Sequence, residues 1–294
     1  MTKGLAVFLI LLAVVVLYMF MIMPRMFGSP DDSAFRTSLF AHRGVFNNRT
    51  QAPENSMPAF RRAVDEGFGI ELDVQLTKDG IPVIFHDFTL MRACGEHGLL
   101  SSYSWDELRQ FRLFESQERI PRLDEFLEMV NGRVPLMVEI KSNKTDMEIC
   151  RKTDELLSSY RGVYCIESFN PLVLFWYRRH RGSIMRGQLS DGFTGTPEYR
   201  VIVHRPFLLA MQFLLVNVLS RPDFVSYNAK YKNNLSRKLC RSLFKKRSAA
   251  WVVQSKDDLE KYRHHFDVFI FDGFIPEGFQ FSTEDNSGER DRLN

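Results

Sequence analysis

The chain has 294 residues, enough for one large or two small domains, and its content of 45% apolar and 26% charged residues is that of an ordinary globular protein. The formal net charge of +3 is too small to indicate nucleic acid as a partner. The four cysteines are scattered without Cys-x-x-Cys spacing, which argues against a zinc site or a disulfide framework and predicts buried or partly buried thiols.

The N-terminus carries a long apolar run. Leu5–Met23 holds 19 uncharged residues, just long enough to cross a bilayer core of roughly 30 Å. The alternative is a cleaved signal peptide, but its apolar region is shorter, about 7–15 residues, and ends at a small-x-small site that is missing here. We therefore expect residues 1–36 to form a single-pass membrane anchor and linker. The basic residues that flank the run fix its orientation poorly, and the short N-terminal flank favours an extracytoplasmic domain.

A globular domain is expected from residue 37 to residue 280, followed by a charged tail, 281–294, that we predict to be disordered. Strand-like and helix-like runs alternate through the domain, which indicates a parallel sheet covered by helices. Eight or nine strands fit an α/β fold of the closed (β/α)₈ TIM barrel type better than an open sheet, and the Gly-x-Gly-x-x-Gly of dinucleotide binding does not follow the first strand. Residues 88–123 break the alternation and predict a small insertion after the third strand. The expected strands are Ser38–Ala41, Gly69–Val74, Ile81–Phe85, Val134–Ile140, Gly162–Ile166, Ser183–Arg186, Asp223–Ser226, Ala249–Val253 and Val268–Phe271. The expected helices are Ser56–Glu66, Asp124–Val130, Asp146–Tyr160, Pro171–Arg179, Asn234–Lys246 and Lys256–Arg263.

A second apolar stretch, Pro206–Leu219, has 14 residues and is too short to span a bilayer. Two interpretations have equal weight: a buried helix of the barrel, or a helix that lies in the plane of a membrane.

Acidic residues recur at every second position of two expected strands. Glu71 and Asp73 flank one buried leucine, so both carboxylates face one side of the strand. Two hard oxygen donors on one face make half of a Mg²⁺ or Ca²⁺ site. Glu139 offers a third carboxylate at the end of another strand, and Lys141, two positions on, offers a cation for a phosphate oxygen.

A hairpin is expected to bring a histidine to the carboxylates. Asp79-Gly80 between apolar runs is typical of a two-residue turn. With that turn, paired positions sum to 159, and Asp73 lies opposite His86. The pairing must be antiparallel, because a parallel one needs a crossover of a dozen or more residues.

Further polar residues end the first strand. His42 and Arg43 close it, and catalytic residues of barrels come from the carboxyl ends of several strands. Gly44 lets the chain leave close to a ligand. Each residue alone has a structural alternative, and ion-pair networks imitate active sites. The joint pattern favours a divalent-metal site with acid/base histidines and phosphate-binding cations.

This chain closely resembles glycerophosphodiester phosphodiesterases over about Phe40 to Pro276. The family's pattern is matched in Ala41-His42-Arg43-Gly44, Ala52-Pro53-Glu54-Asn55-Ser56, Ala59-Phe60, Glu71-Leu72-Asp73-Val74, Thr77-Lys78-Asp79-Gly80, Pro82-Val83, His86-Asp87 and Val138-Glu139-Ile140-Lys141, with weaker matches at Ser168-Phe169, Trp251 and Asp272. The resemblance implies a TIM barrel with an insertion after the His-Asp motif. It departs from the pattern at Phe271-Asp272-Gly273, where Thr-Asp-x-Pro is usual, and in the long apolar segment Ser190–Arg221.

The resemblance also implies roles for the site residues. A divalent cation, Mg²⁺ or Ca²⁺, is bound by Glu71, Asp73 and Glu139. The general acid/base pair is His42 and His86, without an indication of which is the acid. The substrate is bound by Arg43 and Lys141 at its phosphate, by Glu54 and Asn55, with Glu54 a further candidate for the metal, and by Trp251 at its glycerol. In this family the attacking group is a neighbouring glycerol hydroxyl or water.

The expected reaction is metal-dependent hydrolysis of a glycerophosphodiester to an alcohol and glycerol 3-phosphate. The membrane features make lysophospholipids, cleaved on the headgroup side, an alternative substrate, beside glycerol-phosphate polymers. A catalytically inactive, membrane-bound lipid- or phosphate-binding barrel would be expected to lack a ligand or histidine, and none is missing. Paired carboxylates also serve glycoside hydrolysis, but two histidines beside Arg43 and Lys141 favour a phosphate.

Overall fold

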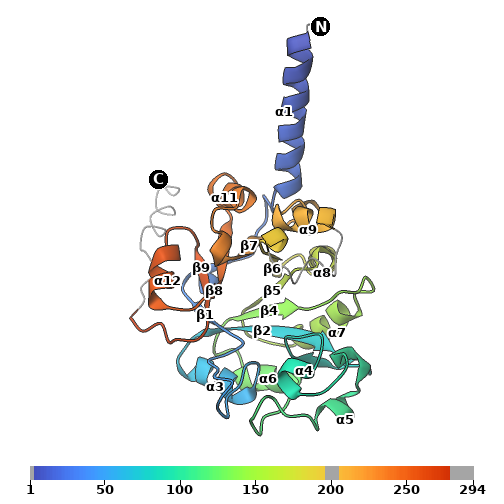
Figure 1. The fold of residues 1–294 in the computed structure, drawn as a ribbon, viewed down its shortest axis with the longest axis vertical. Coiled ribbons are helices and arrows are strands. Elements are labelled where there is room, and N and C mark those ends of the chain that lie inside the picture. The colour runs from blue at the N-terminus through green and yellow to red at the C-terminus, as the bar shows by residue number, and fades with distance from the viewer. Residues whose placement is uncertain (1–2, 196–204, 279–294) are drawn as a thin grey trace.

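The computed structural model describes residues 3–195 and 205–278, and within them eight parallel strands close into a barrel (Figure 1). The strands follow the order β1-β9-β8-β7-β6-β5-β4-β2, and a pairing of β1 with β2 closes the ring. A further strand, β3, pairs antiparallel with β2. All nine expected strands and the predicted (β/α)₈ barrel are confirmed. The strands are β1 (Leu39–His42), β2 (Gly69–Leu76), β3 (Pro82–Ile84), β4 (Leu136–Ile140), β5 (Tyr164–Ser168), β6 (Met185–Ser190), β7 (Phe224–Asn228), β8 (Arg247–Val253) and β9 (Val268–Phe271).

The six expected helices of the domain are also confirmed and surround the barrel. They are α3 (Met57–Asp65), α6 (Leu123–Val130), α7 (Glu148–Leu157), α8 (Pro171–His180), α11 (Leu235–Ser242) and α12 (Lys256–Tyr262). N-cap side chains define where several of these helices begin. The Ser56 side chain, for example, accepts a hydrogen bond from the Ala59 amide at the N-terminus of α3. The remaining helical elements are α1 (Lys3–Ile22), α2 (Ser33–Arg36), α4 (Met91–Cys94), η1 (Leu100–Ser102), α5 (Trp105–Leu108), η2 (Phe193–Gly195), α9 (Arg205–Gln212), α10 (Asn217–Ser220) and η4 (Ala229–Tyr231).

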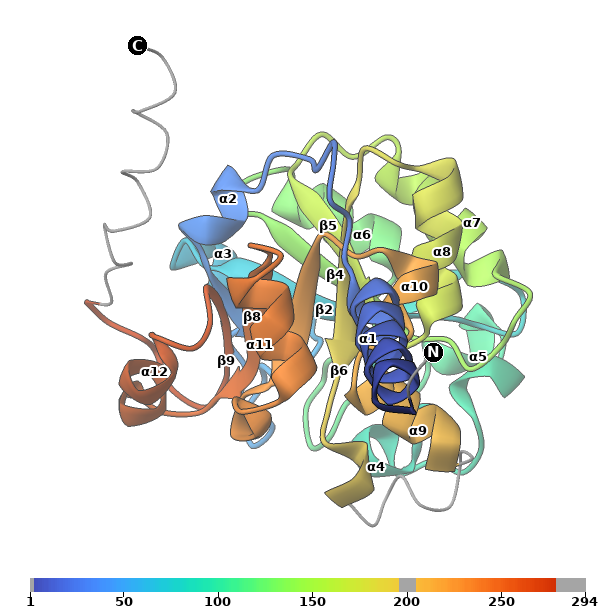
Figure 2. The ribbon, with the colours of Figure 1, turned by 90° about the horizontal axis from the view of Figure 1, so that it is seen from above.

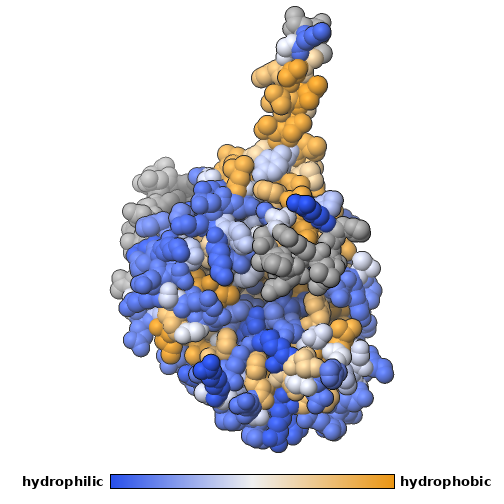
Figure 3. All heavy atoms as spheres, in the orientation of Figure 1, coloured by the Kyte–Doolittle hydropathy of each residue, from blue (hydrophilic) through white to orange (hydrophobic). Residues whose placement is uncertain are grey.

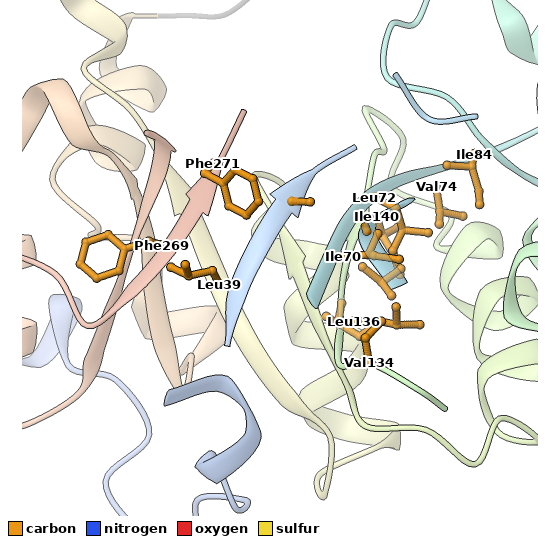
Figure 4. Packing of buried hydrophobic residues seen from close by; sticks show 14 of the residues in the cluster. Leu39, Ile70, Leu72, Val74, Ile84, Val134, Leu136, Ile140, Phe269 and Phe271 are labelled. Carbon is orange, nitrogen blue, oxygen red and sulfur yellow. The ribbon is translucent and has the colours of Figure 1, made fainter. Parts of the chain in front are cut away.

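Alternation along each strand divides its side chains between two layers. Ile70, Leu72 and Val74 of β2 point outward and pack under the helices, as Figure 4 shows for this outer layer. The inner layer begins with apolar residues such as Phe40 at the amino ends of the strands. Gly69 makes room for it, because a Cβ there would lie 2.6 Å from the Phe40 ring. The inner layer turns acidic toward the carboxyl ends, so the core of the barrel supports a polar rim.

The β2–β3 hairpin differs from the expected register by one residue. Val74 pairs with Ile84, so paired positions sum to 158, and the Phe85 amide donates to the Asp73 carbonyl. The prediction that His86 lies opposite Asp73 is therefore wrong. The turn is one residue longer than expected, because the Thr77 amide bonds the Ile81 carbonyl and Gly80 takes a left-handed conformation.

The insertion predicted at residues 88–123 is a small subdomain with α4, η1 and α5. Its core is built from apolar side chains that pack on β3, through Val83. Its own buried members are Leu90, Ala93, Leu100, Leu108, Leu113 and Ile120.

The stretch Pro206–Leu219 forms two short helices in place of one. The helix is interrupted between α9 and α10, where Leu214 has a left-handed φ of 55°. One side of α9 buries Leu208 and Met211, while Phe207 and Leu209 stay exposed. The buried face agrees with the interpretation of a barrel helix, and a membrane contact of the exposed face stays a prediction.

At the N-terminus, α1 projects from the domain (Figure 1) and is the one described helix that is long and apolar enough to cross a membrane. Seen from above, α9, α10 and α11 lie around its foot (Figure 2). Three of the cysteines are buried thiols and Cys94 is partly buried, as predicted. The tail predicted to be disordered, 281–294, lies outside the described residues.

Candidate active site

Three carboxylates meet at the carboxyl end of the barrel. Glu71 and Asp73 come from the inner face of β2, and Glu139 comes from β4, where it pairs in register with Asp73. One oxygen from each lies within 4.8 Å of the others, and all three residues are buried. Three hard oxygen donors at this spacing fit a divalent cation such as Mg²⁺ or Ca²⁺. The strands thus bring together the three acids that the sequence singled out.

The protonation of this group reflects burial and mutual repulsion. Burial, with Asp73 close by, raises the pKa of Glu71 well above its ordinary value, and burial also raises the pKa of Glu139. Lys141 Nζ lies 3.2 Å from Asp73 Oδ1 and 3.0 Å from Glu139 Oε1. Burial opposes the charge on Asp73, but this lysine, with His86 and Arg43, holds the Asp73 pKa well below its ordinary value. More carboxylates than cations are buried here, which favours a bound divalent cation.

Arg43 and Asn55, at the two ends of the loop between β1 and α3, close over Asp73. The Arg43 Nε lies 3.4 Å from Asp73 Oδ2, and Asn55 Nδ2 donates to the same oxygen at 2.9 Å. Both residues have a left-handed φ of 56°. Such conformations are costly for residues with a side chain and gather at functional sites. The backbone of this loop is therefore bent at both ends to direct these two donors at the acidic group.

Gly44 serves the fold where we expected it to make room for a ligand. Its φ is +84°, and a Cβ at this position would lie 2.8 Å from the Ala59 carbonyl carbon. The glycine therefore lets the loop after β1 pack directly on the backbone of α3.

His42 is held by a carboxylate from the far end of the chain. Its Nδ1 lies 3.0 Å from Asp272 Oδ2, and its Nε2 lies 3.9 Å from Glu71 Oε2. Burial and the nearby Arg43 lower the His42 pKa, while Asp272 partly opposes this shift. The imidazole is therefore neutral at neutral pH, with Nε2 toward the acidic group.

His86 is held in the same manner by its neighbour. Its Nδ1 lies 2.5 Å from Asp87 Oδ1, and Asp87 Oδ2 accepts a hydrogen bond from Arg92 Nε at 2.6 Å. A carboxylate on Nδ1 fixes the ring and leaves Nε2 for chemistry in both histidines. Although His86 is not opposite Asp73, it is close enough to lower the Asp73 pKa.

Glu54 does not belong to the three-carboxylate group. Arg43 Nη1 and Arg92 Nη2 each donate to its Oε1 at 2.7 Å, and Asn48 Nδ2 donates to Oε2 at 2.9 Å. These donors outweigh burial and lower the pKa of Glu54 to about 2. Glu54 thus positions Arg43 and ties the insertion, through Arg92 of α4, to the site. Arg92 could not be predicted from the sequence, because no local signal places the insertion over the Glu54 loop.

Glu167 is an acid that the sequence analysis missed. It is the residue before the last in β5, pairs in register with Glu139 and is 1% exposed. Burial, with repulsion from Glu139, raises its pKa to about 8. It lies one residue beyond the expected strand Gly162–Ile166, and extending that strand would have placed it on the inner face.

The aromatic side of the site contains Trp251, predicted to line a glycerol pocket. It lies on β8, and its ring centroid is 5.7 Å from that of Phe169 in an edge-to-face contact. Its Nε1 is buried and has no hydrogen-bond partner in the part of the chain that the structure describes. A buried indole N–H usually has an acceptor, so this donor is available to a ligand.

Comparisons with known proteins give one family. The sequence profile of the glycerophosphoryl diester phosphodiesterase family matches residues 42–257. Human glycerophosphodiester phosphodiesterase 1 is 27% identical over 268 residues, which cover 82% of this chain and 79% of the human protein. The glycerophosphodiester phosphodiesterase of Bacillus altitudinis is 42% identical over 112 residues, or 36% of this chain and 44% of that protein. The match thus spans less than half the length of this bacterial relative.

Solved structures share the fold. The phosphodiesterase of Oleispira antarctica, in complex with the product sn-glycerol-3-phosphate, superposes with a TM-score of 0.62 at 22% identity, covering 80% of this chain and 92% of that one. The glycerophosphodiester phosphodiesterase of Thermotoga maritima gives a TM-score of 0.59 at 24% identity, with coverages of 80% and 94%.

Proposed function

Because the chain belongs to the glycerophosphoryl diester phosphodiesterase family, we propose that it hydrolyses glycerophosphodiesters to an alcohol and glycerol 3-phosphate. One observation carries the proposal: two histidines, each fixed at Nδ1 by its own carboxylate, flank three buried acids at one end of the barrel. This combination supplies a base, an acid and a cation site for a phosphodiester.

The cations of the site orient the substrate. Arg43 and Lys141 are largely buried positive groups beside the acids, and each offers N–H donors to a phosphate oxygen. A divalent cation held by Glu71, Asp73 and Glu139 would neutralise the phosphodiester and polarise its P–O bonds. The Trp251 N–H and ring provide a surface for the glycerol.

The histidines move the protons. His42 is neutral at neutral pH, so its Nε2 accepts the proton of the attacking hydroxyl, from water or from the substrate's own glycerol. Attack by water gives glycerol 3-phosphate directly, whereas attack by the glycerol hydroxyl gives a cyclic phosphate that a water molecule then opens. His86 donates a proton to the oxygen of the departing alcohol. Asp272 and Asp87 hold the two rings in place during this exchange.

Replacement of each histidine tests this assignment. In the full chain, His42→Ala and His86→Ala should each lower the release of glycerol 3-phosphate from glycerophosphocholine by at least roughly 100-fold, while the protein stays folded. The matched control is His264→Ala, which removes an exposed histidine of the α12–β9 turn and should leave the rate unchanged. Wild-type rates in a folded His42→Ala or His86→Ala chain would contradict the proposal.

A second candidate substrate is a lysophospholipid cleaved on its headgroup side. A strip of apolar side chains starts at Trp251, which contacts Phe169. Phe169 in turn contacts Phe193, and Phe193 packs on the buried face of α9. This strip offers a path for an acyl chain between the site and the foot of α1. A lysophospholipid preferred over glycerophosphocholine in kcat/KM would favour this substrate.

We further propose that α1 is retained as the anchor of a single-pass protein with an extracytoplasmic domain. Ile22, at the end of α1, is fully buried against the domain. Cleavage after the apolar run would remove this side chain from the core.

A further inference from the structure

The last turn of α1 is built into the folded domain. The Tyr18 hydroxyl lies 2.8 Å from Ser236 Oγ on α11, and Asn217 of α10 donates from Nδ2 to the Ile22 carbonyl at 2.9 Å. Arg221 donates from Nη1 to the Met23 carbonyl at 2.7 Å. The last carbonyls of a helix have no partner within it, and here the domain supplies partners. The helix is thus fixed to the domain by its end.

The length of α1 decides where this junction lies. The exposed part, residues 3–17, measures about 22 Å at 1.5 Å per residue, whereas a bilayer core is roughly 30 Å thick. The whole helix, Lys3–Ile22, measures about 30 Å and just matches that thickness. A bilayer that α1 spans therefore reaches down to Tyr18–Ile22, the level at which α1 touches α10 and α11.

Exposed apolar side chains lie on the α9–α10 segment and on α11, next to the base of α1 (Figure 2). We call them the collar, and its members are Phe207, Leu209, Phe213, Leu219 and Leu235. Figure 3 shows hydrophobic surface gathered at the foot of α1, over α9 and α11.

Contacts join the parts of the collar into one surface around α1. Asn234, beside Leu235, donates from Nδ2 to the Gln212 carbonyl, beside Phe213, at 3.0 Å. Ser236, on the other side of Leu235, touches α1 through Tyr18. The collar is therefore continuous with the membrane-spanning helix.

Basic side chains stand next to the collar in the chain. Arg205 precedes Phe207 by two residues, and Lys238 follows Leu235 by one helical turn, and both are exposed. Long basic side chains reach outward to headgroups while apolar neighbours enter the acyl region. Apolar side chains flanked by basic ones in this way are typical of a protein surface that lies in a membrane interface.

We propose that the collar inserts into the headgroup and upper acyl region of the membrane that α1 spans, so that the domain is held in one orientation on a lipid surface. This inference rests on the proposed retention of α1 and is independent of the reaction. The buried face of α9 packs on Phe193, which contacts Phe169 of the active-site strip. The collar therefore places one side of the active site at the lipid boundary.

The test measures depth in the full chain, reconstituted in nanodiscs of phosphatidylcholine and phosphatidylglycerol. Nitroxide labels are attached at Phe213→Cys or Leu235→Cys in a Cys94→Ser background, because the other three thiols are buried. The matched control is Leu99→Cys, since Leu99 is 49% exposed against 58% for Leu235 and belongs to the insertion away from α1. Collisions with oxygen and with a water-soluble nickel chelate are recorded for each label.

At positions 213 and 235 we expect nickel collisions at least about fivefold lower than at position 99, with oxygen collisions raised. Labels as accessible to nickel as the control would overturn the proposal, and so would dipolar broadening between two copies, which would assign the surface to a dimer. Intact mass shows whether α1 is present, and its loss would overturn the proposal as well. Turnover of glycerophosphocholine by the same labelled chains reports separately on the proposed reaction.

Discussion

At the scale of single residues, the proposed proton transfer depends on the contact between His42 and Asp272. The carboxylate fixes the ring through Nδ1 and stabilises its protonated form, which raises its pKa against the effects of burial and Arg43. Gln254 Nε2 holds the other oxygen of Asp272 at 3.1 Å. Asp272 therefore acts through His42 as a positioning residue.

Asp272→Asn should lower kcat roughly 10- to 100-fold, because the ring loses its fixed orientation. The His42 pKa should also fall further, so the acidic limb of the kcat/KM profile should move to lower pH. Asp257→Asn, at an exposed carboxylate of α12, is the control and should change neither. An unchanged acidic limb would show that His42 is not the base or that Asp272 does not tune it.

Glu54 should make the protein sensitive to acid. Its carboxyl titrates near 4.5 when unfolded and near 2 when folded, a difference worth about 3 kcal/mol at roughly 1.4 kcal/mol per pH unit. This stabilisation is present above pH 4.5 and is lost as the pH falls toward 2. Urea unfolding of the detergent-solubilised chain should show that Glu54→Gln is less stable than wild type at pH 7 and that the gap narrows by pH 3. The exposed Glu128→Gln serves as control, and a gap that is equal at both pH values would contradict the assignment.

The polar residues at the strand ends could be predicted from the sequence because alternation alone puts Glu71, Asp73 and Glu139 on inner faces. The residues that hold the site residues in place could not be predicted in this way. Asp272 is 230 positions from His42, and only closure of the barrel through β1 and β9 brings the two together. The same holds for Arg92, which comes from an insertion whose position depends on tertiary packing.

At the scale of elements, the loop from β1 to α3 depends on Gly44, a position that has no room for a side chain. Gly44→Ala would combine a φ of +84° with a Cβ at 2.8 Å from backbone, so we expect a loss of more than about 2 kcal/mol in unfolding free energy. Gly182→Ala is the matched control, since its nearest neighbour would be 4.0 Å away, and it should stay within about 0.5 kcal/mol of wild type. Equal effects of the two substitutions would contradict the packing described here.

Element types followed from hydrophobic periodicity, but turns did not. A single extra residue in the Thr77–Ile81 turn shifted the hairpin by one position, and Asp79-Gly80 fits both turn types. Likewise, no glycine or proline marked the break at Leu214, which depends on tertiary packing of α9 and α10.

For the whole molecule, the barrel carries an acidic site and an apolar surface at different places. Its carboxyl end holds the three acids, and α1, α9, α10 and α11, which carry exposed apolar side chains, lie near one another (Figures 1 and 2). The strand–helix alternation was sufficient to predict the barrel, since few folds accommodate eight such units. The packing of α1 on the domain could not be predicted, because it depends on contacts some two hundred residues apart, such as Tyr18 with Ser236.

The proposed phosphodiester hydrolysis requires that Glu71, Asp73 and Glu139 bind a divalent cation. The most direct measurement is the release of glycerol 3-phosphate from glycerophosphocholine by the full chain, before and after EDTA treatment and after add-back of Mg²⁺ or Ca²⁺. We predict that EDTA abolishes turnover, that one of the two cations restores it, and that Asp73→Asn is not restored. Full turnover in EDTA, or no turnover of the folded chain with either cation, would contradict metal-dependent hydrolysis at these three acids.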